Sequence, residues 1–247
     1  MIKLFRNIRK QLLNENKTTK YLKYAIGEIV LVVIGILIAL QINNWNEARK
    51  TENKIKNSLE ALISDLIQDT LLITQIRPFI LEQYNFNESL RARVASQNAT
   101  VDTLIHIMHY EFNPNWKDQI IYNINTYNSL NQTGLIENLS DPLKTIIKNF
   151  YNKKFSLQSR VQKTTNDYRE KITSYVNTYT FGSTPIHDQG KLIDSLVWTN
   201  INHSHLAATF QGISNFKRIL FTETKIELDY SLTTSRHIIK QINNYLK

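Results

Sequence analysis

The chain of 247 residues contains no cysteine and has a formal net charge of +9. The lack of cysteine excludes a disulfide framework and thiolate chemistry. The charge does not indicate a nucleic-acid partner, because residues 44–247 carry 23 basic and 19 acidic side chains without a basic stripe or a recognisable binding module.

Residues 1–23 form a basic segment, with seven basic side chains against Glu15 alone. By the positive-inside rule we expect this segment to stay in the cytoplasm. If residues 2–13 are helical, their apolar side chains gather roughly on one side and suit a helix lying in the plane of an anionic leaflet. The alternative is a disordered basic tail that only sets the topology, because so short a helix is marginal in isolation.

Residues 24–43 predict a transmembrane helix. They include 18 nearly uncharged residues, and about 27 Å of helix just crosses a hydrocarbon core of about 30 Å. Tyr21, Tyr24 and Trp45 are placed for the two headgroup regions. A cleaved signal peptide would need a small-residue cleavage site, which this run lacks, and a buried core helix would normally show a polar face.

One side of this span carries small residues and a carboxylate. Gly27, Glu28, Gly35 and Ala39 fall in an arc of about 120° at the helical period. Small residues let another helix approach closely, and a carboxylate in a bilayer avoids lipid tails. We therefore expect the arc to contact a second transmembrane helix, from another copy of the chain or from a partner protein. The alternative is that Glu28 only reaches back to the cytoplasmic headgroups.

Residues 44–247 predict an all-α, extracytoplasmic, antiparallel helical bundle with long helices. The first rod has a heptad seam in which Asp69 takes one apolar position, and Ile63 and Ile67 widen it to the stripe of a bundle helix. Pro78 should kink or end this rod because it has no N–H to donate, and a helix should resume over residues 79–97. The seam consists of Ile55, Leu59, Leu62, Leu66, Asp69, Ile73, Ile76 and Ile80.

The middle of the domain predicts a short helix over residues 101–110, a turn at Pro114, and a further helix from about Trp116 to Gly134. Ser140, followed by Asp141 and Pro142, is a strong helix start. From there a helical period continues for almost forty residues to Tyr179. This should be the second long rod of the bundle.

The last third contains the least regular stretch, residues 180–202, which includes a short predicted helix, KLIDSLVW. Long irregular connections are either functional or mobile, so this loop is a candidate site. Two C-terminal helices should follow, separated by a capping box formed by Thr224 and Glu227.

The candidate chemistry of the chain is sparse. His106 and His109 lie three apart on a predicted helix with Glu111 close behind, which makes them weak candidates for a metal site that needs three or four ligands. The other interpretation is that they flank the core side of an amphipathic helix. The common hydrolase, nucleotide-binding, zinc and redox motifs are absent from the sequence, so we expect no catalytic residue and no cofactor.

Two stretches resemble a known family. The segment KYLKYAIGEIVLVVIGILIALQINNWNEARK looks like the N-terminal hallmark of an uncharacterised family of bacterial single-pass membrane proteins, and TYNSLNQTGLIENLSDPLKTIIKNFYN is similar to a looser pattern of the same family. The resemblance implies an inner-membrane anchor and a helical domain outside the cytoplasm. It supplies no activity and no catalytic residue.

These observations favour a non-enzymatic binding or interaction module, sensor-like or scaffold, held in the bacterial inner membrane with its N-terminus in the cytoplasm and its C-terminal domain in the periplasm. Its expected partners are the lipid bilayer and another transmembrane helix. Two alternatives are an extracytoplasmic enzyme, with a site near His106 and His109 or under the loop at 180–202, and a structural assembly factor.

Overall fold

The computed structural model describes residues 18–247 apart from 117–119, 181 and 184–188. Within this part of the chain every regular element is a helix, so the all-α prediction is confirmed. The chain divides into two compact units, residues 1–57 and residues 58–247, and helix α2 (Thr18–Val94) has residues in both. The predicted helix over residues 2–13 lies outside the described residues.

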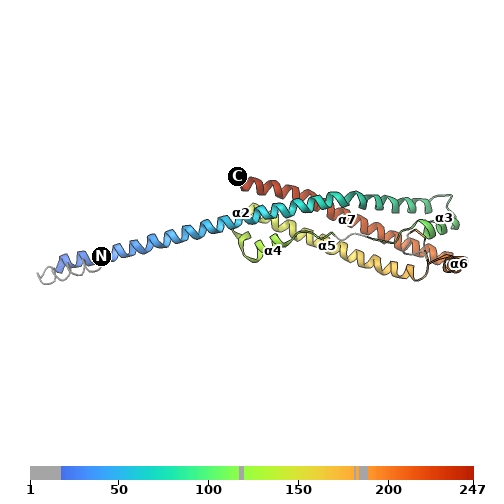
Figure 1. Ribbon diagram of the computed structural model, residues 1–247, viewed down its shortest axis with the longest axis horizontal. Coiled ribbons are helices and arrows are strands. Elements are labelled where there is room, and N and C mark those ends of the chain that lie inside the picture. Colours follow the sequence, from blue (N-terminus) through green and yellow to red (C-terminus); the bar gives the residue numbers. More distant parts are fainter. Residues whose placement is uncertain (1–17, 117–119, 181, 184–188) are drawn as a thin grey trace. The chain divides into compact units, whose positions relative to one another are not determined.

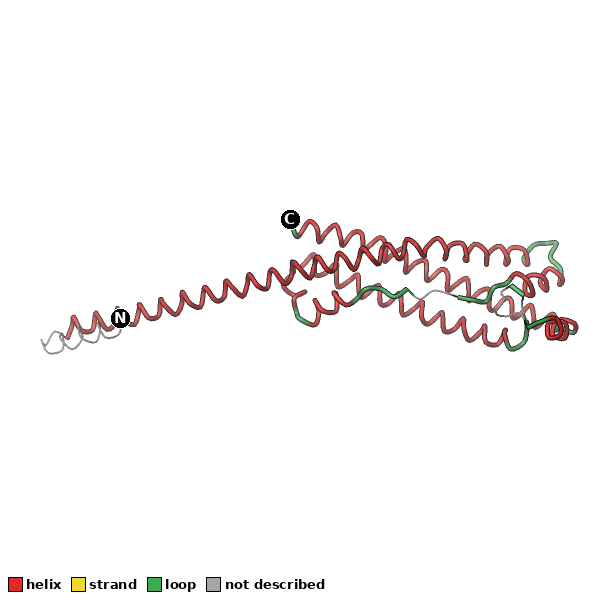
Figure 2. The backbone as a smooth tube through the Cα atoms, in the orientation of Figure 1, coloured by secondary structure: helices red, strands yellow, loops and turns green. Residues whose placement is uncertain are grey.

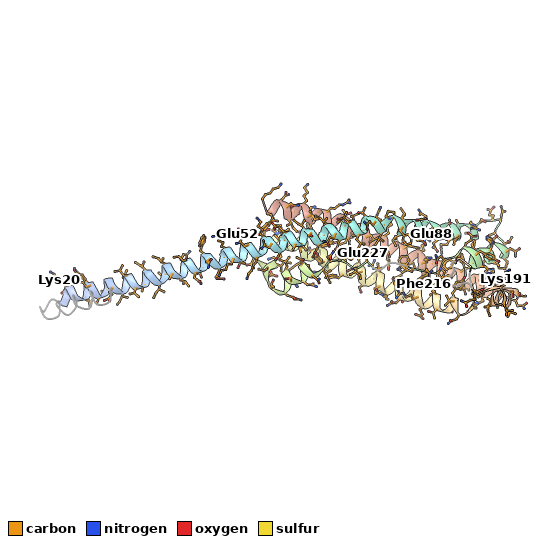
Figure 3. All side chains as sticks on the ribbon, in the orientation of Figure 1. Lys20, Glu52, Glu88, Lys191, Phe216 and Glu227 are labelled. Carbon is orange, nitrogen blue, oxygen red and sulfur yellow. The ribbon has the colours of Figure 1, made fainter. Side chains whose placement is uncertain are left out.

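The first unit contains the predicted membrane span. One helix near the N-terminus is long and apolar enough to cross a membrane, and no residue in its most apolar window is buried. Figure 3 shows side chains projecting above and below this part of α2, between the labelled Lys20 and Glu52. The apolar surface of this segment is therefore left uncovered by the rest of the described chain.

The second unit is built on three long helical segments: α2 from residue 58 onward, α5 (Asp141–Val176) and α7 (His203–Tyr245) (Figures 1 and 2). Helix α7 runs antiparallel to α2, because its early residue Ser214 bonds to Asn87 and its later residue Asp229 pairs with Arg77. It also runs antiparallel to α5, because Phe216 lies near Lys171 and Tyr230 lies near Phe150. The hydroxyl of Thr164 on α5 likewise reaches Glu223 on α7.

The seam of α2 is confirmed, since its members from Leu59 to Ile80 are all buried except Ile76, which is partly buried. Ile67, by contrast, is 44% exposed and does not widen the buried stripe. Of the two outcomes predicted at Pro78, a kink or an end, the end is excluded, because α2 continues through Pro78 to Val94. Ile73 and Ile80 are buried on either side of the proline, and this packing compensates for the missing N–H.

Short elements follow α2. Thr100 and Thr103 form a capping box at the start of α3 (Val101–His106), which leads into a π-helical turn, η1 (Ile107–Glu111). The predicted helix from Trp116 is wrong over its first half, because the described residues between 112 and 124 are not helical and α4 spans only Asn125–Gln132. Gly134 has φ of 71°, as predicted for a left-handed cap, and begins the 3-10 turn η2 (Leu135–Asn138).

The non-helical segment after η1 is held by polar side chains from the long helices. The hydroxyl of Tyr168 donates to the carbonyl of Pro114 at 2.8 Å, and the ammonium of Lys217 donates to the carbonyl of Asn113. The hydroxyl of Tyr175 donates to the carbonyl of Met108 at 2.9 Å, in the preceding π turn. Backbone carbonyls buried outside a helix need such donors, and a helix-period pattern cannot reveal them.

Helix α5 begins at Asp141 with Pro142 in its first turn, as predicted, although the side chain of Ser140 makes no capping hydrogen bond. The short helix predicted in the irregular stretch is confirmed as α6 (Lys191–Thr199). The predicted break at Thr224 and Glu227 is wrong, because α7 is one continuous helix and both residues are buried on its core side. The polar buried residues of α7 are Ser214, Lys217, Thr224, Glu227, Ser231 and Ser235.

Candidate functional site

The first candidate surface is the small-residue arc of the predicted span. Gly27, Gly35 and Ala39 are exposed, and a Cβ placed on either glycine would meet no atom within 4 Å. Glu28 lies on the same arc. The surface is thus open to another helix, and the contact itself stays a prediction.

The predicted interfacial aromatics are found on the same helix. Tyr24 is 51% exposed and Trp45 is 65% exposed, and the guanidinium carbon of Arg49 lies 5.8 Å from the centre of the Trp45 ring. The side chain of Tyr21 lies outside the described residues. A ring with a cation beside it has both an apolar body and a polar neighbour, which suits a headgroup region.

The two candidate histidines have different surroundings. His106 is exposed, with its Nε2 3.4 Å from Glu111. His109 is buried, and its Nε2 lies 2.7 Å from Oδ1 of Asp194 on α6. Among the described residues no group of three or more His, Cys, Asp or Glu is arranged to hold a metal ion. His109 therefore bonds to Asp194, a residue of the irregular stretch 180–202, and the two histidines do not share a metal site with a third ligand among the described residues.

His109 is the centre of a cluster that fastens α6 to the rest of the unit. Its ring stacks between Tyr110, at 3.9 Å between centroids, and Trp198, at 4.3 Å. Thr180 donates to Asp194 at 2.8 Å and accepts from the indole N–H of Trp198 at 2.9 Å. Asp194 is 85 positions from His109, so sequence reasoning named the histidine and the loop but had no signal that would pair them.

Replacing His109 by Ala should loosen α6. The change removes a hydrogen bond and two ring contacts, each of which is worth on the order of 1 kcal/mol. We expect faster amide hydrogen exchange over residues 191–199, read by mass spectrometry. His106→Ala is the matched control, because that side chain is 61% exposed. Equal exchange in the two variants would contradict this role for His109.

A buried ionic layer crosses the unit at mid-length. The ammonium of Lys154 on α5 lies 2.9 Å from Asp69 on α2, with both side chains at most 1% exposed. Asp69 also accepts from the backbone and side-chain N–H groups of Asn123. The ammonium lies 3.7 Å from the centre of the Tyr122 ring, and the hydroxyl of Tyr122 donates to Glu227 on α7 at 3.0 Å.

Burial decides the electrostatics of this layer. It lowers the pKa of Lys154, against the opposing effect of Asp69. It raises the pKa of Glu227, against the opposing hydrogen bonds from Ser231 and Tyr122. Both shifts express the cost of keeping a charge away from water. The layer joins side chains of α2, α5 and α7 at one level, an arrangement that suits fixing the register of the three long helices.

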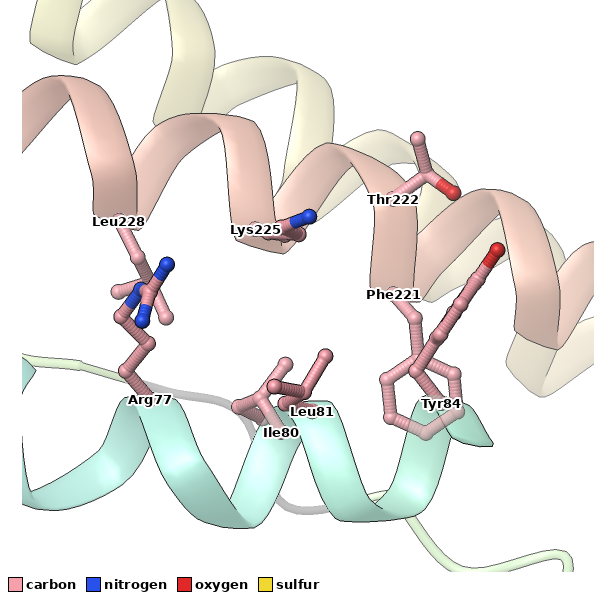
Figure 4. A pocket seen from close by; sticks show the side chains of 8 residues that line it. All are labelled: Arg77, Ile80, Leu81, Tyr84, Phe221, Thr222, Lys225 and Leu228. Carbon is pink, nitrogen blue, oxygen red and sulfur yellow. The ribbon is translucent and has the colours of Figure 1, made fainter. Parts of the chain in front are cut away.

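A surface groove lies between α2 and α7 (Figure 4). Its volume is about 130 Å³. Arg77 and Leu228 lie at one end, Tyr84 and Phe221 lie at the other, and Lys225 lies between them on α7. The remaining lining residues are Ile80, Leu81 and Thr222. Sequence reasoning missed this groove, because its two walls lie more than a hundred positions apart along the chain.

Comparison with known proteins identifies a family. A family profile described as a family of unknown function, DUF6090, matches residues 28–181, which include most of the span, α2 from residue 28 onward and all of α5. No curated protein and no solved structure matches the chain. The profile ends before α6 and α7, so it leaves out one wall of the groove and Asp194.

Proposed function

The chain belongs to DUF6090, a family of unknown function, and from this premise we propose that it is a non-enzymatic binding module anchored in the bacterial inner membrane. In this proposal residues 1–23 lie in the cytoplasm, residues 24–43 span the membrane, and residues 44–247 form a periplasmic helical bundle. The module binds through its helical unit, and its span contacts a second transmembrane helix.

The proposal of a membrane anchor rests on the exposure of the apolar segment. The large apolar side chains from Leu22 to Ile42 are 46–63% exposed, whereas those of the seam from Leu59 to Leu66 are fully buried. Soluble monomers rarely expose a contiguous apolar surface of this extent. A bilayer removes it from water without requiring a protein cover, and the basic residues before it favour a cytoplasmic N-terminus.

A binding role is supported by what the helical unit offers on its surface. The groove between α2 and α7 combines apolar walls with cationic side chains, which is the composition of a ligand site. The Nε2 atom of His109, by contrast, is bonded to Asp194 and its ring is covered on both faces by aromatic rings. This histidine is therefore engaged in packing, and the groove is the better place for a ligand.

The absence of native cysteine makes the topology directly testable. We expect a membrane-impermeant maleimide to label Ser64→Cys in intact spheroplasts and to label Lys20→Cys only after the membrane is permeabilised. Both positions are exposed on the protein, so a difference in labelling would report the side of the membrane and not burial within the protein. Labelling of the two positions in the opposite order would overturn the orientation, and extraction of the protein by carbonate would overturn the anchor.

The contact through the span is tested by photo-crosslinking. A photoreactive residue at Leu31, which lies within the arc of small residues, should crosslink to a second transmembrane protein or to another copy. The same residue at Val33, on the opposite side of the helix, should not. Gly35→Leu together with Ala39→Leu should abolish the crosslink from Leu31, because the added side chains prevent close approach. An unchanged crosslink would contradict the contact.

A further inference from the structure

We propose that the groove between α2 and α7 binds a small carboxylate with a compact apolar body, such as an aromatic acid. This inference names a ligand class for the binding module proposed above and rests on that function. It is carried by three properties of the groove, namely its apolar walls, its volume and its charge.

The walls of the groove are apolar and rigid. Ile80, Phe221 and Leu228 are at most 2% exposed, so the core of the unit fixes their positions, and the apolar surface that a ligand can reach is mainly that of Leu81 and Tyr84. The ring of Tyr84 meets that of Phe221 edge to face, with 6.3 Å between centroids. Figure 4 shows these two rings closing one end of the groove. Such walls favour a flat or compact apolar group.

The volume limits the size of that group. The groove measures about 130 Å³, and an apolar cavity of about 150 Å³ accommodates benzene. A single ring therefore matches this volume, whereas a long acyl chain or a folded peptide segment would extend beyond the groove. Leu81, which is 41% exposed at the edge, covers one side of the bound group.

The charge of the groove selects an anion. Arg77 is already paired, with its Nε 2.6 Å from Asp229. Lys225 belongs to none of the ion pairs among the described residues, in which the other basic groups near it, Arg77 and Arg218, pair with Asp229 and Glu88. Its side chain lies above the apolar walls, between Arg77 and Thr222. One uncompensated ammonium matches a monoanion better than a phosphate, which would call for two or more free cations.

The experiment measures binding of 4-fluorobenzoate to the full-length protein in lipid nanodiscs by ¹⁹F NMR, with 4-fluorobenzyl alcohol as the neutral analogue and empty nanodiscs as the blank. Nanodiscs avoid a detergent that would compete for an apolar groove. We expect saturable binding of the acid, and weaker binding of the alcohol by about three- to fivefold, because an exposed charge pair adds little.

Two variants separate the contributions of charge and apolar contact. Lys225→Gln should weaken binding of the acid about three- to fivefold and leave the alcohol unchanged, whereas Leu81→Asn should weaken both ligands equally. Lys240→Gln is the matched control, because it is exposed on the same helix about 22 Å away. Equal binding of acid and alcohol, or an effect of Lys240→Gln as large as that of Lys225→Gln, would overturn the assignment.

The outcome also distinguishes this inference from the proposed function. If neither ligand binds above the blank while maleimide labelling still reports the expected topology, the ligand class is wrong and the anchored module stands. If the topology fails, the function fails whatever the groove binds.

Discussion

Lys154→Met should lower the free energy of unfolding by about 3–5 kcal/mol, because it leaves the carboxylate of Asp69 buried without its cation. Both partners lie in the core, where water cannot replace the lost interaction. The measurement is urea unfolding of the full chain in nanodiscs, followed by circular dichroism. Lys50→Met is the control, because Lys50 pairs with Glu47 on an exposed surface and its loss should cause no measurable change.

The double variant Asp69→Asn with Lys154→Met should recover most of the lost stability. The amide oxygen of Asn can still accept the hydrogen bonds from Asn123, and no unpaired charge remains. The coupling energy from the double-mutant cycle measures the pair directly. A double variant as unstable as the sum of the single variants would show that the two charges act independently, contrary to the geometry.

We expect the free energy of unfolding to increase as the pH rises from 7 to 9.5, because the ammonium group of Lys217 is buried. Burial lowers the pKa of Lys217 from 10.5 to about 8, so between these values the unfolded chain binds more protons than the folded chain. Stability therefore increases with pH across this window, by about 2 kcal/mol between pH 7 and 9.5. The lowered pKa of Lys154 acts in the same direction.

The measurement is the midpoint of thermal unfolding at a series of pH values. Lys217→Met should remove most of the rise, whereas Lys240→Met, at an exposed position, should keep it. Above about pH 10 the buried tyrosines oppose the trend, because burial raises the pKa of Tyr122, Tyr151 and Tyr175. A midpoint that is flat from pH 7 to 9.5 in the unmodified protein would contradict the lysine's role.

Most of the helices were predictable because each obeys a local rule. The apolar period located α2 and α5, and Gly134 marked the end of the helix before η2. The errors arose where tertiary contacts override such rules. The helix predicted from Trp116 begins only at Asn125, and the Thr224 and Glu227 pair, which has the spacing of a capping box, lies in the middle of α7.

The candidate sites were less predictable than the helices. His109 drew attention through its spacing to His106, but its partners Asp194 and Trp198 lie on α6, 85 and 89 positions away along the chain. The groove joins Arg77 and Tyr84 to residues of α7 that have no motif of their own. Contacts of this kind leave no periodic signal, because neither partner constrains the sequence near the other.

The sequence by itself determined the apolar span, its basic flank and the helical class of the chain. Each of these depends on composition and on a short-range period, which the chain carries wherever it folds. Only the tertiary structure decided that residues 112–116 and 120–124 stay non-helical, that Asp69 pairs with Lys154, and that a groove forms between α2 and α7. The physical reason is that buried polar groups must find partners, and the nearest partner in space, such as Lys217 for the carbonyl of Asn113, is often remote along the chain.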